Sequence, residues 1–317
     1  MSEKRKLGNS GLEVAPLALG GNVFGWTVQQ PAAAFTLLDR FVDAGFNLID
    51  TADMYSKWAP GNSGGESETI LGQWLKHSGK RSKVLIATKV GMEMGPGRKG
   101  LSRTYILRAV EDSLRRLQTD RIDLYQSHAD DPETPMEETL ETYGQLIRQG
   151  KVRTIGASNF TADRLAQSLR ISEQHGYPRY ESLQPHYNLY ERATYEAELE
   201  PVCRSNNLGV IPYFSLASGF LTGKYRSEAD LSKSARGAGV KKYLNDRGFR
   251  ILAALDQVAL GYRATPAQVS LAWLMARPGI TAPIASATSI DQLNQLADAT
   301  EIELDPASIA LLNHASS

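Results

Sequence analysis

Short apolar segments that are typical of buried strands recur along this chain, and helical patterns separate them almost from end to end. The segment 46–50 is apolar until it stops at Asp50. The segment 84–89 repeats this pattern and stops at Lys89. Parallel strands joined by helices place all their carboxyl ends on one face of a sheet or barrel. The polar residues at these ends are therefore expected to lie close together.

Eight strand patterns, each followed by a helical pattern, predict a closed (β/α)8 barrel in which residues 1–317 form a single domain. An Asn-Ser-Gly turn predicts a β-hairpin over 5–14 ahead of the barrel. Helical patterns after residue 290 predict extra C-terminal helices. The expected barrel strands lie at residues 15–21, 46–50, 84–89, 122–127, 154–159, 182–188, 209–213 and 280–287.

A doubly wound open sheet is the structural alternative to the barrel. Such a sheet usually carries a G-x-G-x-x-G phosphate loop between its first strand and first helix. Residues 20–25 are glycine-rich but lack that spacing. The barrel is therefore favoured.

Charge and cysteine content exclude several classes of protein. Acidic and basic residues balance at 35 each, so nothing indicates binding to nucleic acid or to an anionic membrane surface. The single cysteine, Cys203, cannot form an internal disulfide and excludes a thiolate metal cluster, as is usual in a reducing cytosol. Residues 1–12 have no apolar core, and no later segment reaches the roughly 18 apolar residues of a membrane span. A cytoplasmic protein without membrane contact is expected.

The segment 215–244 differs from the rest of the chain. It is rich in Gly, Ser, Lys and Arg and shows no periodicity. It is longer than the roughly 12–15 residues of an ordinary loop, and such long loops are commonly functional. We expect it to form a lid over the site.

Four residues at or just beyond successive strand ends form a candidate catalytic group: Asp50, Tyr55, Lys89 and His128. A free tyrosine has a pKa near ~10, which is too high for ready proton exchange at neutral pH. A lysine ammonium beside the phenol would lower that pKa, and a carboxylate would keep the lysine charged and in place. An imidazole could orient a carbonyl oxygen or relay a proton.

Each of these residues also has a structural interpretation. Asp50 could cap a helix, and Tyr55 could be a loop aromatic. Lys89 could be a solvated strand end, and His128 a core histidine with satisfied hydrogen bonds. Their occurrence at successive strand ends favours the catalytic interpretation for the group as a whole. A metal-dependent hydrolase is a weaker alternative, because only His128 and His186 of the five histidines follow strand patterns, so no metal site is predicted.

The chain resembles the aldo-keto reductases over nearly its whole length. This resemblance implies the (β/α)8 barrel and hydride transfer between a nicotinamide cofactor and a carbonyl or alcohol. It also implies that Tyr55 is the general acid, that Lys89 and Asp50 tune it, and that His128 positions the substrate. The matching segments are L-G-N-S-G-L at 7–12, D-T-A-D-M-Y at 50–55, residues 68–72, T-K at 88–89, Y-Q-S-H at 125–128, G-K-V-R-T-I-G-A-S-N at 150–159, Gln184 with Tyr187-Asn188, and G-F-L-T-G-K at 219–224.

The potassium-channel β subunits share this barrel and most of these residues. A nicotinamide-binding regulatory subunit with little turnover is therefore the alternative to an enzyme. Measured turnover would separate the two.

The resemblance also implies a set of cofactor-binding residues. Ser158, Asn159 and Gln184 match the residues that hydrogen-bond the nicotinamide carboxamide. Tyr213 matches the aromatic residue that stacks on the nicotinamide ring. The other implied residues are Gly21, Asn22, Asp50, Phe214, Ser215, Leu216, Ala217, Ser218, Lys224, Ser286, Thr288, Gln292 and Gln295.

Departures from the family pattern bear on the choice of cofactor. Phe214-Ser215 replaces a commoner Ser-Pro, and small polar residues stand where many members bind a 2′-phosphate with basic ones, at Ser286, Thr288 and Gln292. The segment after Tyr213 could supply the missing positive charge through its own basic residues, Lys224, Arg226, Lys233 and Arg236. The resembling channel subunits also have small polar residues at those positions and bind NADP(H). We expect NADP(H), with NAD(H) as the alternative.

An apolar wall and an adaptable rim are expected beside the tyrosine. Phe24, Trp26 and Trp58 follow the first two expected strands, and the long segment 55–66 is glycine-rich. Sugar aldehydes, small ketones and secondary alcohols would all fit such a wall. The expected partner is a small-molecule carbonyl or alcohol, and the sequence leaves both the substrate and the oligomeric state open.

Overall fold

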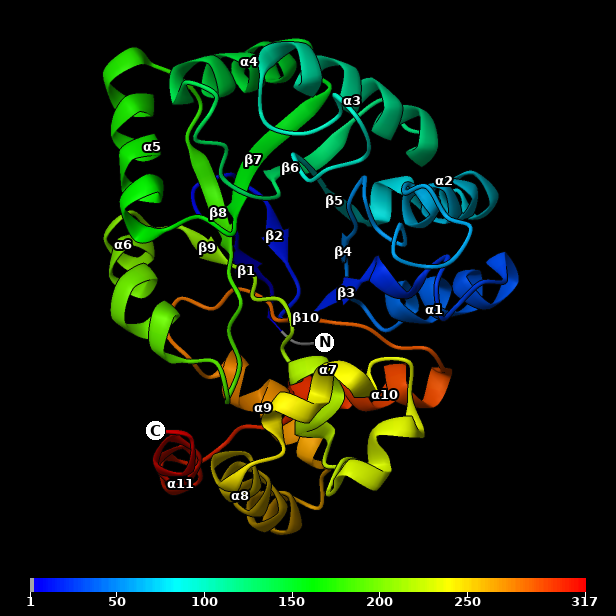
Figure 1. The fold of residues 1–317 in the computed structure, drawn as a ribbon, viewed down its shortest axis with the longest axis vertical. Coiled ribbons are helices and arrows are strands. Elements are labelled where there is room, and N and C mark those ends of the chain that lie inside the picture. Colours follow the sequence, from blue (N-terminus) through cyan, green and yellow to red (C-terminus); the bar gives the residue numbers. More distant parts are fainter. Residues whose placement is uncertain (1–2) are drawn as a thin grey trace.

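Eight parallel strands form one strongly curled sheet in the structure, a computed structural model that describes residues 3–317 (Figure 1). Met1 and Ser2, the first two residues of the predicted domain 1–317, lie outside the described residues. The single domain stays a prediction. In sheet order the strands are β10 (Ile284–Ala285), β3 (Ala18–Gly20), β4 (Leu48–Asp50), β5 (Leu85–Val90), β6 (Ile122–Ser127), β7 (Val152–Ser158), β8 (Tyr180–Gln184) and β9 (Gly209–Val210).

Hydrogen bonds join the two outer strands of this order. Val210 in β9 pairs with Ile280, which precedes β10. The backbone N–H of Thr281 donates to the carbonyl oxygen of Val210 at 2.8 Å, and that of Ile284 donates to Pro212 at 2.9 Å. The predicted barrel class is confirmed, and the open doubly wound sheet is wrong.

Helices between the strands cover the outside of the barrel (Figure 1). Strands enclosed in this way are buried on both faces, which explains why they read as continuous apolar segments. The side chains of Ser102 and Thr161 cap the helices that follow them, and Thr265 begins another helix with a capping box. The helices are α1 (Pro31–Asp43), α2 (Glu66–Ser78), α3 (Arg103–Leu117), α4 (Met136–Arg148), α5 (Ala162–His175), α6 (Glu200–Ser205), α7 (Gly237–Val240), α8 (Asp246–Tyr262), α9 (Pro266–Met275), α10 (Ile290–Asp298) and α11 (Pro306–Ser316).

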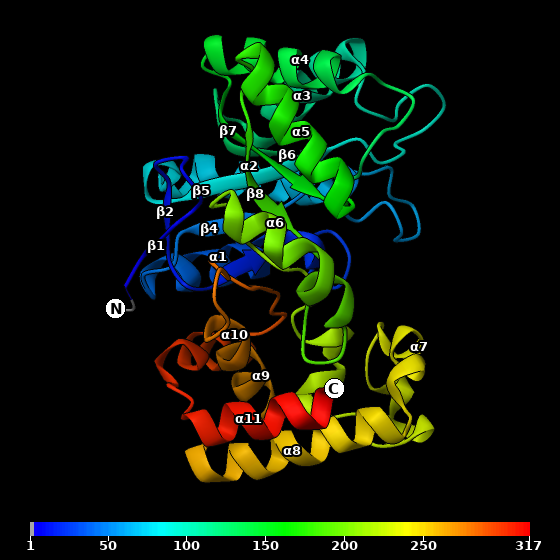
Figure 2. The same cartoon turned by 90° about the vertical axis from the view of Figure 1, so that its left-hand side faces the viewer.

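The predicted hairpin closes the amino-terminal end of the barrel. Its strands β1 (Arg5–Lys6) and β2 (Glu13–Val14) pair antiparallel. Leu7 and Leu12, between those strands, pack against side chains that point into the barrel, including Leu48, Ala87, Leu124 and Ile211. Figure 2 shows the hairpin and α7 at opposite ends of the barrel.

The segment 215–244, here called the covering segment, is more regular than expected. It contains α7 and short 3₁₀ turns at Ala217–Thr222 and Glu228–Lys233. Such turns contain too few residues to show a helical period in the sequence. Buried Tyr225 and Tyr243 anchor the segment to the core.

The predicted extra C-terminal helices are present. Helix α10 packs against α1, and α11 lies along α8 (Figure 2). Within residues 3–317, none of the helices has the length and apolar character that crossing a bilayer would require.

Gly72 in α2 allows α2 to pack closely on α3. A Cβ atom at this position would overlap the backbone carbonyl of Arg116. We expect Gly72→Ala to lower the free energy of unfolding by about 1–3 kcal/mol, because backbone atoms cannot move aside. Gly261 in α8 has open space around it. Gly261→Ala should therefore leave stability unchanged or raise it by up to ~1 kcal/mol. Urea unfolding followed by circular dichroism measures both, and equal stabilities would contradict the expectation.

Candidate functional site

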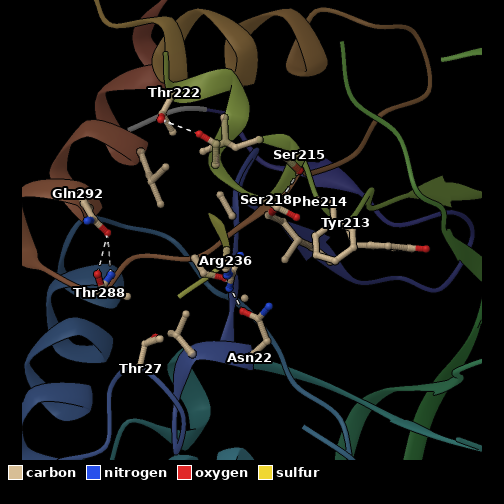
Figure 3. A pocket seen from close by; sticks show the side chains of 18 of the residues that line it. Asn22, Thr27, Tyr213, Phe214, Ser215, Ser218, Thr222, Arg236, Thr288 and Gln292 are labelled. Atoms are coloured by element: carbon tan, nitrogen blue, oxygen red, sulfur yellow. Dashed lines mark hydrogen bonds between the residues drawn. The ribbon is translucent and has the colours of Figure 1, made fainter. Parts of the chain in front are cut away.

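A cavity of about 1060 Å³ lies at the carboxyl ends of the barrel strands. Figure 3 shows side chains from opposite sides of this cavity, among them Asn22, Tyr213 and Gln292. Of the predicted site residues, those in its lining are Asn22, Asp50, Tyr55, His128, Ser158, Asn159, Gln184, Tyr213, Phe214, Ser215, Leu216, Ser218, Lys224, Ser286, Thr288, Gln292 and Gln295. The other predicted residues, Gly21, Lys89 and Ala217, are buried outside the lining.

Asp50 is the centre of a buried hydrogen-bonded group. Its Oδ2 accepts hydrogen bonds from Lys89 Nζ at 2.7 Å and from Tyr55 OH at 3.3 Å. Its Oδ1 accepts hydrogen bonds from Gln184 Nε2 at 2.9 Å and from Gln126 Nε2 at 3.2 Å. Gln126 was not among the predicted site residues. It lies two residues before the predicted histidine, and alternate strand residues face the same side, so strand periodicity could have identified it.

Lys89 uses every donor of its ammonium group. It is fully buried and donates to Asp50, to Tyr55 OH at 2.8 Å and to the backbone carbonyl of Thr51 at 2.8 Å. Its Nζ lies 4.5 Å from the centroid of the Tyr55 ring. Burial lowers the pKa of Lys89, whereas the negative charge of Asp50 opposes that shift. The complete set of hydrogen bonds offsets the desolvation of the buried charges.

The pKa of Tyr55 moves in the opposite direction from the sequence prediction. Burial raises it well above 10, and the charge of Asp50 raises it further. The predicted effect of Lys89 is outweighed because the carboxylate that holds the lysine also contacts the phenol. Tyr55 therefore keeps its proton at neutral pH, as a proton donor must.

His128 packs edge-on against Tyr55, with ring centroids 6.0 Å apart and an interplanar angle of 71°. Burial lowers the pKa of His128 well below 6.5, and the charge of Lys89 lowers it further, so the imidazole is neutral at pH 7. Its Nδ1 is buried and has no hydrogen-bond partner within residues 3–317. The alternative of a core histidine with satisfied hydrogen bonds is therefore wrong.

The predicted carboxamide-binding residues form one hydrogen-bonded group across β7 and β8. Ser158 pairs with Gln184 in the strand register, and its Oγ donates to the Gln184 carbonyl at 3.0 Å. Asn159 Nδ2 donates to the His128 carbonyl at 2.8 Å. Tyr213 OH donates to Asn159 Oδ1 at 2.8 Å. The group links the candidate catalytic residues to the start of the covering segment.

Strained backbone follows Tyr213. Phe214, Ala217 and Ser218 have φ angles of 53°, 47° and 58°, which non-glycine residues rarely adopt. Such conformations concentrate at ligand-binding sites. Within this turn, Ala217 N donates to the Phe214 carbonyl at 2.7 Å and Gly219 N donates to the Leu216 carbonyl at 2.8 Å.

Side chains hold this strained turn in place. Ser215 Oγ donates to the Ile284 carbonyl at 2.8 Å, and Asn188 Nδ2 donates to the Phe214 carbonyl at 2.9 Å. Lys224 lines the cavity beside the turn. A positive side chain therefore lies beside the strained turn.

The basic residues of the covering segment differ in availability. Arg226 forms two hydrogen bonds of 2.8 Å with Asp256 and is absent from the lining. Lys233 lines the cavity and is paired with Asp230 at 2.7 Å. Arg236 reaches into it (Figure 3) and lies 5.4 Å from the Trp26 ring, and its buried Nη2 has no partner among the described residues.

Polar side chains without positive charge line the part of the cavity beside β10 and α10. Ser286 Oγ donates to Asn22 Oδ1 at 2.7 Å. Gln292 Oε1 accepts hydrogen bonds from Thr288 N at 2.9 Å and from Thr288 Oγ1 at 3.1 Å (Figure 3). Residues 284–298 contain neither Lys nor Arg. Positive charge at this end must come from elsewhere in the chain.

The apolar wall differs in part from the prediction. Trp58 lines the cavity and packs edge-on against Trp26 at 5.8 Å and against Tyr55 at 5.9 Å. Phe24 is 1% exposed and belongs to the core, so its placement in the wall is wrong. Its bridge to Val28 turns the chain back after β3 and directs the ring inward. Met92, which the sequence did not single out, lines the cavity.

Asp53 lies behind the catalytic group and was not predicted as a site residue. It is 2% exposed, and neither carboxylate oxygen has a partner among the described residues. Burial raises the pKa of Asp53 to about 8, and the neighbouring Glu68 raises it while Arg116 lowers it. Glu68 is itself paired with Arg116 at 2.7 Å.

Comparisons with known proteins agree on one family. Residues 16–317 match the model described as "Aldo/keto reductase family". The chain is 36% identical over 315 residues to "Uncharacterized oxidoreductase YrpG" of Bacillus subtilis (strain 168), covering 97% of this chain and 94% of that protein. It is 31% identical to "Aldo-keto reductase YhdN" of the same organism (94% and 88% covered). It is also 31% identical to "Probable voltage-gated potassium channel subunit beta" of Oryza sativa subsp. japonica (91% and 88% covered).

The raised pKa of Asp53 predicts how stability depends on pH. The folded protein holds this proton up to about pH 8, whereas an unfolded aspartate loses it near the usual 3.8. The free energy of unfolding therefore falls as pH rises through this window. Between pH 5.5 and 8.5, loss of this proton should lower the free energy of unfolding of the wild type by on the order of 3 kcal/mol. In Asp53→Asn this decrease should be absent. Urea unfolding at both pH values measures it.

Asp230→Asn is the matched control. The hydrogen bond with Lys233 lowers the pKa of Asp230 to about 2, so this carboxylate does not titrate in the same window. Its variant should keep the pH dependence of the wild type. An Asp53→Asn variant with that same dependence would contradict the assignment of a buried neutral acid.

Proposed function

The chain belongs to the aldo/keto reductase family, and on this premise we propose that it is an oxidoreductase that interconverts an aldehyde or ketone and the corresponding alcohol with a nicotinamide cofactor. The observation that carries the proposal is the contact of one phenol with a buried ammonium and a buried carboxylate at the edge of a large cavity. A bound nicotinamide would supply or accept the hydride.

Tyr55 is the general acid of this proposal. Its raised pKa keeps the phenol protonated at neutral pH, ready to donate to a carbonyl oxygen. As the proton leaves, negative charge develops on the phenol oxygen. The ammonium of Lys89 already donates a hydrogen bond to that oxygen and stabilises this charge. Asp50 keeps the ammonium in position, and the alcohol reaction uses the same residues in reverse.

His128 positions the carbonyl group. Its neutral imidazole can donate a hydrogen bond to an oxygen without competing for the proton of Tyr55. The edge-on contact with the Tyr55 ring fixes its orientation. Trp58 and Met92 supply an apolar surface for the remainder of a small carbonyl or alcohol substrate.

The cavity has the parts that a nicotinamide dinucleotide needs. Ser158, Asn159 and Gln184 offer amide and hydroxyl groups for a carboxamide, and Tyr213 offers a flat ring. In this proposal the turn after Tyr213 receives the diphosphate, because Ser218 and the positive side chain of Lys224 line the cavity there. These side chains are already ordered by hydrogen bonds to one another, so binding would need little rearrangement.

NADP(H) is the cofactor that we favour. The β10 side of the cavity offers only neutral hydrogen bonds, which would serve a ribose hydroxyl equally well. Lys233 and Arg236 of the covering segment, however, bring positive charge into the lining. Since this charge comes from a surface segment, we expect NAD(H) to be used as well, with lower affinity.

A cofactor-binding regulatory subunit is the second candidate function. The similarity to plant proteins named as probable potassium channel β subunits favours it. Both candidates require cofactor binding, and turnover separates them. A panel of aldehydes, ketones and alcohols assayed in both directions tests this directly.

Removal of the phenol hydroxyl tests the proposed acid. Tyr55→Phe should lower kcat for carbonyl reduction by roughly 10²-fold or more, in line with other general acids, while the Kd of the cofactor changes little. Steady-state assays and fluorescence titration measure the two quantities. Tyr105→Phe, which removes a phenol outside the cavity lining, is the control. Near-normal kcat in Tyr55→Phe would overturn the proposal.

Salt dependence tests the source of the phosphate contacts. NADPH should bind more tightly than NADH at low salt, and the difference should shrink as salt screens the surface charges. The double variant Lys233→Ala/Arg236→Ala should lose most of that difference. Arg226→Ala should keep it, because that guanidinium is paired with Asp256 and lies outside the cavity lining. Equal or tighter binding of NADH at low salt would contradict the preference.

A further inference from the structure

His186 stacks on one face of Tyr213. The two ring centroids are 5.3 Å apart and the ring planes differ by only 17°. The backbone enforces this contact, because His186 and Tyr213 form a parallel bridge and Tyr213 N donates to the Pro185 carbonyl at 2.9 Å. Phe214 packs edge-on against the same imidazole, with centroids 5.4 Å apart.

A hydrogen bond, and not the stack with His186, holds the hydroxyl group of Tyr213. It donates to Asn159 Oδ1 at 2.8 Å, and Asn159 is tied to the backbone of His128. That hydrogen bond fixes the position of the hydroxyl group, and Phe214 packs edge-on against the ring with centroids 5.2 Å apart. The stack with His186 fixes the plane of the ring, and Tyr213 lines the cavity (Figure 3).

The imidazole contributes a flat uncharged surface. Burial lowers the pKa of His186 below 6.5, and of the two charged groups nearby Glu191 opposes this shift while Lys242 adds to it. The Nε2 atom is buried and has no hydrogen-bond partner within residues 3–317. An imidazole that makes no hydrogen bond through this nitrogen acts at this contact as an aromatic ring would.

We propose that His186 is a positioning residue that holds the plane of Tyr213 for stacking on the nicotinamide ring. This inference rests on the proposed function, in which Tyr213 receives that ring. A tyrosine whose ring plane is already set loses less side-chain freedom when a cofactor ring stacks on it. In the proposed function, the adenosine and diphosphate would lie against other residues of the cavity lining, and His186 is not part of that lining.

The experiment compares two ligands on three proteins. NADPH and 2′-phospho-ADP-ribose, which is the same molecule without nicotinamide, are titrated by calorimetry against the wild type, His186→Ala and His186→Phe. We expect His186→Ala to raise the Kd of NADPH about three- to tenfold. The Kd of 2′-phospho-ADP-ribose should stay within about twofold of the wild type. His186→Phe should restore the Kd of NADPH, because it restores the flat ring.

His175→Ala is the matched control. His175 stacks on Tyr177 with nearly the same geometry, 5.4 Å and 13°, on an exposed helix end outside the cavity lining. Its variant should bind both ligands as the wild type does.

The possible outcomes distinguish a failure of the role of His186 from a failure of the proposed function. An unchanged Kd of NADPH in His186→Ala, or an equal loss for both ligands, would overturn the role of His186 while leaving the proposed function in place. Failure of the phenylalanine variant to restore binding would also overturn it, since the plane of the ring would not be the cause. A wild type that binds neither NADPH nor NADH would overturn the proposed function and this inference with it.

Discussion

The buried ion pair between Lys89 and Asp50 is the interaction on which the rest of the site depends. Both side chains are almost completely removed from water, which is costly for charged groups unless every donor and acceptor is used. Here Lys89 donates its remaining hydrogen bonds to Thr51 and Tyr55, and the second oxygen of Asp50 accepts hydrogen bonds from side-chain amides on β6 and β8. The pair thereby fixes Tyr55 relative to several strands at once, which is the order that a proton donor requires.

The barrel can hold such a buried ion pair because different kinds of side chain fill its two ends. At the amino-terminal end, Leu7 and Leu12 of the hairpin complete an apolar cluster. At the carboxyl end, the inward positions carry charged and amide side chains that satisfy one another. Since the strands are parallel, these polar ends lie side by side without any long loop to carry them. The less regular covering segment then supplies what a rigid barrel cannot, namely strained backbone and positive charge beside the cavity.

Several features of the site escaped prediction for identifiable reasons. The pKa of Tyr55 rises because the phenol is buried and because the aspartate that holds Lys89 also contacts it, and this geometry has no signature in the spacing of residues. Gln126 was not predicted because a single amide within an apolar strand does not indicate a site until the residues on the neighbouring strands are known. Phe24 was placed in the wall from its position after β3, yet a local bridge turns it into the core.

The sequence by itself determined the order of strands and helices, the barrel class and which residues stand at the strand ends, because these depend on local periodicity and on the short segments that match the family. It did not determine which side chains touch. The three-way contact of Lys89, Asp50 and Tyr55 and the stack of His186 on Tyr213 arise between residues from separate parts of the chain. The burial of Asp53 without a hydrogen-bond partner within residues 3–317 likewise depends on the packing around it. Only the closure of the barrel sets those distances, because strand register and burial are collective properties that no single segment contains.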